Sequence, residues 1–141
     1  MSPGKTLPRP CRALNVLSDT LPRSRAEAIE RGDLVDVTEL AAGKRFIVPV
    51  ALTAEVFEDV RDLSSHYVLS SETVESRLDR VLHYARANVA SNESRSGFEF
   101  SLYLPVGDRT TYSAALRLMS GDEPGQSVIT ISKLEQNRRL P

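Results

Sequence analysis

The chain has 141 residues, of which 40% are hydrophobic and 26% are charged, and its formal net charge is −1. These values are typical of one globular domain, and they exclude both the global basic field of many nucleic-acid binders and the acidic excess of a DNA mimic. The single cysteine, Cys11, excludes an internal disulfide and a multi-cysteine zinc site, and the lack of an apolar run of bilayer length predicts a cytoplasmic protein with no membrane partner.

Residues 1–23 are rich in proline and basic side chains, a composition that resists helix formation and favours extended or disordered chain. Two interpretations remain, a basic arm that touches phosphate and a frayed terminus, and we favour the second because chain ends are usually poorly ordered. We therefore predict a flexible arm at 1–23, a single α+β domain at 24–134 and a loose polar tail at 135–141.

The domain begins with a helix signal. Ser24 and Glu27 match a capping box, and Gly32 is a natural residue to end the helix that follows. Residues 34–37 are typical of a short strand. Asp36 is the one polar residue in that run; it either satisfies a neighbouring backbone group or faces a site, and we prefer the former.

A second short helical turn is expected over 39–42, capped by Thr38 and ended by Gly43. The run 46–52 is apolar throughout. Because Pro49 has no N–H to donate, we interpret this run as an edge strand or an extended connection, and not as a central strand.

A helix over 54–63 is predicted after the N-cap Thr53, with Val56, Val60 and Leu63 on its apolar side and Phe57 next to it. The acidic run of Glu58, Asp59 and Asp62 is interpreted as a solvated face, because charge runs on helices usually face water.

The longest helical pattern covers residues 72–90, with Ser71 as the expected N-cap and negative charge in the first turn. Its apolar residues recur at spacings of three and four, which places them in one stripe that should face the core. They are Val74, Leu78, Val81, Leu82, Ala85 and Val89.

The last third of the chain changes to the alternating pattern of strands, over 98–104, 112–118 and 128–131, with turn signals between them. Short turns between strands predict an antiparallel meander, and its apolar face needs a cover. The expected fold is therefore α+β: a three-stranded antiparallel meander packed against the long central helix, with shorter helices and strands from the N-terminal half around the same core.

No catalytic, cofactor-binding or metal-binding motif stands out. His66 and His83 are not at ligand spacing, no cysteine lies near them, and the chain has no glycine-rich phosphate loop or nucleophile elbow. Asp79 and His83 lie four residues apart on the central helix and are either an acid–base pair or a surface ion pair, which is the more common case. We therefore predict no catalytic residues, no metal and no cofactor, and lean towards a protein that is not an enzyme.

Binding is the better-supported class of function. Spacing puts arginines and a tyrosine on one side of the central helix, where they would grip phosphates and stack a base, although neighbouring acidic residues weaken the patch. Two tyrosines in the sheet would instead line a face that binds a protein partner. The predicted partner or nucleic-acid contacts are Arg77, Arg80, Tyr84, Arg86, Tyr103 and Tyr112.

Three segments carry a resemblance: SRAEAIERGDLVDVTELA followed by FIVPVALTAEVFEDV, then ETVESRLDRVLHYAR, and then SGDEPGQSVITI. Together they resemble an uncharacterised family of small plasmid- and phage-borne bacterial proteins, over most of residues 24–131. Phe57 stands where that family commonly has tryptophan. The resemblance implies a mobile-element origin and no catalytic residues.

These observations lead to two main hypotheses. The first is a non-enzymatic binding protein of mobile-element type that inhibits a host defence complex, as anti-CRISPR or anti-restriction proteins do. The second is a nucleic-acid-binding accessory protein that uses the arginine side of the central helix. A host protein complex or nucleoprotein is the expected partner, and a homodimer through a free sheet edge is a further expectation.

Overall fold

The computed structural model describes residues 24–92 and 95–134, so the predicted arm, the predicted tail and Cys11 lie outside the described residues. Helices and strands alternate in the first half, and strands dominate the second half. The elements are α2 (Arg25–Arg31), β2 (Leu34–Asp36), α3 (Thr38–Ala42), β3 (Val50–Thr53), α4 (Ala54–Arg61), α5 (Val74–Ala87), the 3₁₀ turn η1 (Ala90–Asn92), β4 (Gly97–Val106), β5 (Arg109–Ser120) and β6 (Ser127–Lys133).

One five-stranded sheet of order β2-β3-β6-β5-β4 organises these elements. The β3–β6 pair is parallel and the other three pairs are antiparallel. The expected α+β class is confirmed, and β4, β5 and β6 form the expected meander. The sheet is nevertheless not three-stranded, because β2 and β3 extend it beyond β6.

The position of Pro49 just before β3 explains why the interpretation of residues 46–52 as an edge strand fails. The strand begins at Val50, one residue after the proline, so the missing N–H costs no bond within the ladder. The Pro49 carbonyl accepts from the Ile129 N–H at 2.9 Å and starts the parallel pairing with β6. The interpretation of 46–52 as an edge strand is therefore wrong: Val50–Thr53 is an interior strand, and its first three residues are fully buried.

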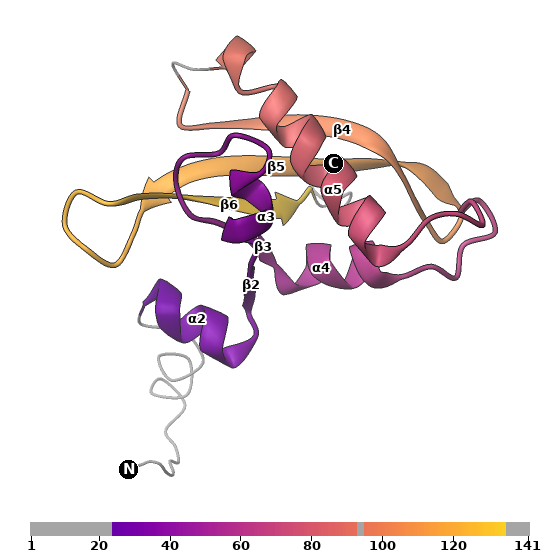
Figure 1. Ribbon diagram of the computed structural model, residues 1–141, viewed down its shortest axis with the longest axis horizontal. Coiled ribbons are helices and arrows are strands. Elements are labelled where there is room, and N and C mark those ends of the chain that lie inside the picture. The colour runs from indigo at the N-terminus through magenta and orange to yellow at the C-terminus, as the bar shows by residue number, and fades with distance from the viewer. Residues whose placement is uncertain (1–23, 93–94, 135–141) are drawn as a thin grey trace, which may run out of the picture.

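Helix α5 lies across the sheet with its apolar stripe inward (Figure 1). Leu78, Val81, Leu82 and Ala85 are buried in the main core, and Val74 and Val89 pack against it from the ends, as predicted.

The helix is shorter than the predicted 72–90. It starts after Thr73 and not after Ser71, because Thr73 and Ser76 exchange hydrogen bonds in a capping box at 3.0 and 2.9 Å. It ends at Asn88, whose side chain donates to the Tyr84 carbonyl at 2.8 Å.

Local caps set the ends of the other helices. Ser24 and Thr53 accept hydrogen bonds from backbone N–H groups at the starts of α2 and α4, as predicted. Thr38 is the first residue of α3 and not its cap; its hydroxyl instead bonds to the Asp36 carboxylate and the Val50 carbonyl. Asp36 therefore satisfies local groups, including the Thr38 N–H at 3.1 Å, which is the preferred interpretation of this residue.

The two faces of the sheet are covered differently (Figure 1). Helices α3, α4 and α5 contribute to the main core on one face. Helix α2 lies against the other face, where Ala28, Ala51 and Val128 are buried outside that core. Arg25 anchors α2 there by donating to the Thr130 hydroxyl at 2.8 Å. Thr130 is the β6 residue that pairs with Ala51 of β3.

Candidate partner-binding site

The connection between α4 and α5, residues 62–73, is a hydrogen-bonded loop that packs on the hairpin of β4 and β5. Ser65 is buried, donates to the Gly107 carbonyl at 2.7 Å and accepts from the Tyr67 N–H at 3.2 Å. The Tyr103 hydroxyl of β4 donates to the Tyr67 carbonyl at 2.9 Å. These bonds join a loop and a hairpin about forty residues apart in sequence, so the loop is held in a defined shape.

The start of the same loop is fixed by a carboxylate. Asp62 accepts from the Ser64 hydroxyl at 2.6 Å and from the Ser64 N–H at 3.0 Å. These two hydrogen bonds hold the pKa of Asp62 below its usual value, because they favour its charged form. The loop therefore leaves α4 through an ordered turn.

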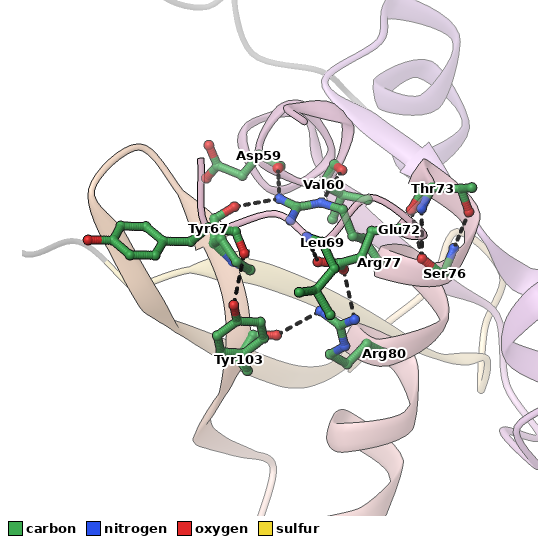
Figure 2. Close-up of polar contacts among 11 residues, drawn as sticks. Asp59, Val60, Tyr67, Leu69, Glu72, Thr73, Ser76, Arg77, Arg80 and Tyr103 are labelled. Carbon is green, nitrogen blue, oxygen red and sulfur yellow. Dashed lines mark hydrogen bonds and ion pairs between the residues drawn. The ribbon is translucent and has the colours of Figure 1, made fainter. Parts of the chain in front are cut away.

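Arg80 links the end of the loop to the sheet (Figure 2). Its guanidinium donates to the Glu72 carboxylate at 2.7 Å and to the Tyr103 carbonyl at 3.0 Å, and it lies 5.8 Å from the centre of the Tyr103 ring. The Glu72 side chain is only 4% exposed and also accepts from the Leu69 N–H at 3.3 Å. One ion pair thus positions the loop, the helix and the β4 strand together.

Large side chains remain exposed on this rigid framework. Leu69 is 60% exposed, and Tyr67 and Tyr103 are 43% and 44% exposed. In Figure 2, Leu69 and Arg80 lie beside Tyr103, and the Tyr67 ring extends outward from the loop. We call Tyr67, Leu69, Arg80 and Tyr103 the loop surface. Exposed tyrosines beside a half-buried arginine on an ordered backbone are typical of sites that bind another protein, and Leu69 adds apolar area.

Arg77 does not belong to any surface. It is fully buried and donates to the carbonyls of Val60 at 2.8 Å, Asp59 at 2.8 Å and Pro105 at 2.9 Å. The first two carbonyls close the C-terminal end of α4, where a cation is favoured by the helix dipole. Burial lowers the pKa of Arg77, and its Nη1 has no partner. Its prediction as a partner contact conflicts with this burial, because a side chain needed for packing cannot also reach a ligand.

Tyr112 is also buried, at 5% exposed, and faces the main core. Its hydroxyl donates to the Asp59 carboxylate at 2.7 Å, and Lys133 lies 3.1 Å from the same oxygen. Burial first, and then this hydrogen bond, raise the pKa of Tyr112 well above its usual value. Asp59 is therefore not part of a solvated acidic face, and Tyr112 joins α4 to the sheet and cannot line a partner surface.

The remaining predicted contacts lie on two different sides of α5. Tyr84 is 41% exposed and follows Arg80 by four residues, so it extends the loop-surface side of the helix. Arg86 lies on the opposite flank, where its Nε donates to the Arg45 carbonyl at 3.4 Å. The structure brings Arg80 and Tyr103 into contact and separates both from Arg86.

Sequence reasoning missed Tyr67 and Leu69. The signal was present, because the connection between the two helices carries a tyrosine and a leucine that belong to neither apolar helix face. Asp79 and His83 do not form the acid–base pair that their spacing allowed: Asp79 pairs with Lys44 at 2.9 Å, and His83 lies against Tyr84 with ring centres 5.4 Å apart.

The described residues contain neither a cluster of metal ligands nor a membrane-spanning helix. Within 24–92 and 95–134, His, Cys, Asp and Glu side chains form no group of three or more that would hold a metal ion. No helix in these two ranges has the length and apolarity needed to cross a bilayer.

Comparisons of the chain with protein-family models, with curated proteins and with solved structures gave no match. The function of the protein is therefore inferred from the geometry of this chain.

Proposed function

We propose that this protein is a small non-enzymatic binding protein that holds a protein partner on the loop surface. The observation that carries the proposal is that Leu69 and Tyr103 are exposed while the backbone beneath them is fixed by the Arg80–Glu72 pair. A pre-ordered surface loses little conformational entropy on binding, and tyrosine and arginine supply most of the energy at protein interfaces.

The proposed partner is a host protein complex or nucleoprotein, and the proposed role is inhibition of a host defence complex by a protein of mobile-element type. The resemblance of three segments to plasmid- and phage-borne proteins supports a mobile-element origin. The pair of exposed tyrosines, with an arginine between loop and sheet, supports a protein partner over a small-molecule substrate.

The test is affinity capture from a nuclease-treated bacterial lysate. The tagged protein should retain one stoichiometric protein partner, and Leu69→Ser or Tyr103→Ser should weaken retention by tenfold or more, as expected for residues at an interface centre. Leu118→Ser is the matched control, because Leu118 is 45% exposed at the far end of β5.

The variants must keep the wild-type melting temperature for the comparison to count. Equal loss of the partner in Leu118→Ser and Leu69→Ser would refute the loop surface as the binding site. Retention of no protein partner once the lysate has been treated with nuclease would refute the protein-partner proposal.

A further inference from the structure

A second feature lies on the opposite flank of α5. The turn after α3 and the C-terminal half of α5 enclose a hollow of about 400 Å³. Basic and small residues form its lining, and we call it the basic notch. They are Gly43, Lys44, Arg45, His83, Arg86, Ala87 and Ala90.

The turn that forms one wall is tightly bonded. Lys44 N–H and Arg45 N–H donate to the carbonyls of Ala41 at 2.9 Å and Ala42 at 3.0 Å, and Phe46 is buried in the core directly after them. Arg45 has a φ of 75°, in the left-handed region that non-glycine residues rarely adopt. The buried Phe46 and the hydrogen-bonded turn fix the backbone of Lys44 and Arg45 beside α5, and backbone strain of this kind is concentrated at functional sites.

The charge in the notch is unbalanced. Lys44 pairs with Asp79 at 2.9 Å, but among the described residues no carboxylate lies within ion-pair distance of Arg45 or Arg86. Arg86 uses only its Nε, on the Arg45 carbonyl, so the rest of its guanidinium fork remains for an acceptor. Three cations and one carboxylate leave a local positive field in a protein whose net charge is −1.

The rim of the notch adds non-ionic contacts. The His83 ring is exposed and lies edge-on against Tyr84, which limits its orientation. Guanidinium groups beside an exposed imidazole ring match a phosphodiester backbone whose bases are unpaired.

We propose that the basic notch binds the phosphate backbone of single-stranded nucleic acid, with Arg45 and Arg86 on phosphates and His83 against a base. A single strand fits because its flexible backbone can follow a small hollow and its bases are free to stack. Duplex binding needs a wider basic face than one notch with three cations provides.

The test is fluorescence anisotropy with a labelled twelve-nucleotide oligo-dT strand at 50 to 200 mM salt. With two phosphate contacts, from Arg45 and Arg86, the slope of log affinity against log salt should be about −1.4, so affinity should fall about 7-fold over this range. Arg45→Ala/Arg86→Ala should reduce affinity at least tenfold at 50 mM salt and bring the slope close to zero.

Two controls make the result specific. Arg117→Ala removes an exposed arginine of β5 outside the notch and should leave affinity within twofold. Asp79→Asn frees Lys44 and should strengthen binding, an increase that an unfolded or damaged variant would not give. If the double alanine variant melts early, Arg86→Gln alone carries the comparison.

Several outcomes would overturn the proposal: no measurable binding at 50 mM salt, equal loss in Arg117→Ala, tighter binding of the matching duplex, or complete competition by 10 mM inorganic phosphate. Tyr103→Ser should not change oligonucleotide binding, because the loop surface lies on the other flank of α5. The proposals for the basic notch and for the loop surface can therefore be confirmed or refuted independently.

Discussion

Replacing Arg77 by methionine tests whether this buried arginine holds the fold together. Methionine keeps most of the aliphatic stem but removes the guanidinium, so the carbonyls of Asp59, Val60 and Pro105 each lose a donor. Two of these carbonyls end α4, and the third lies where the register of β4 shifts in a bulge. The substitution should therefore loosen two elements at once.

The expected magnitude is a balance of two opposing effects. The Asp59 carbonyl keeps the Asp62 N–H as a donor at 3.3 Å, so the carbonyls of Val60 and Pro105 are the two left without a donor. Each buried acceptor left without a donor costs about 1–3 kcal/mol, which sums to about 2–6 kcal/mol for these two carbonyls. Against this, none of the described carboxylates lies within ion-pair distance of Arg77, so removing its buried charge returns part of that cost. We expect a net destabilisation of about 2–4 kcal/mol.

Urea unfolding measures this directly. A loss of about 2–4 kcal/mol should lower the midpoint by roughly 1–2 M at an unchanged slope, given slopes of about 1–3 kcal/mol/M for small proteins. Arg86→Met on the same helix is the control and should change stability by less than about 0.5 kcal/mol. If Arg77→Met unfolds at the wild-type midpoint or above it, the guanidinium is not a structural clamp and must be retained for another reason.

Three further predictions concern the core, a tyrosine and a helix end. Val81→Asp places a charge at a fully buried position of α5 and should cost several kcal/mol, so a wild-type melting curve would contradict the α5–sheet core. The pKa of Tyr112 is raised in the folded state, whereas an unfolded tyrosine ionises near pH 10. The contribution of Tyr112 to the free energy of unfolding should therefore be constant below about pH 10 and fall above it, by up to about 1.4 kcal/mol per pH unit. Tyr112→Phe should flatten that fall in urea titrations at pH 8 to 11. Gly32 has a φ of 86° with open space around its missing side chain, so Gly32→Ala should cost about 1 kcal/mol through backbone strain alone, and a thermal melt showing no loss would refute this reading.

Much of the fold could be predicted because its signals are local. The alternation of residues 98–104 and the apolar stripe of α5 report directly which side faces the core, and both gave the correct burial. The capping signals at Ser24 and Thr53 were sufficient for the same reason. The pairing of β3 with β6 was not predictable, because a parallel contact between Val50 and Ile129 leaves no mark in either short segment.

The candidate sites show a different limit. Spacing grouped Arg77, Arg80 and Tyr84 on one side of the helix, with Arg86 adding charge nearby, but nine residues are two and a half helical turns, so Arg77 and Arg86 point in opposite directions. The burial of Arg77 depends on where α4 ends and where β4 bulges, and both features are set by the tertiary structure and not by the local sequence. The loop surface likewise depends on a bond between Tyr103 and Tyr67 that joins two distant segments.

The arrangement of α5 assigns a separate task to each of its arginines. Arg77 faces inward and satisfies carbonyls, Arg80 is tied to a nearly buried carboxylate, and Arg86 keeps most of its donors unused. A cation already paired in the free protein gains little from a new anion, because the first pair must be broken. An unpaired guanidinium beside a strained turn gains the full interaction. Of the three arginines, Arg86 is therefore the one from which the proposed phosphate affinity should come, and under the proposed function Arg80 would act by shaping the surface that surrounds Leu69.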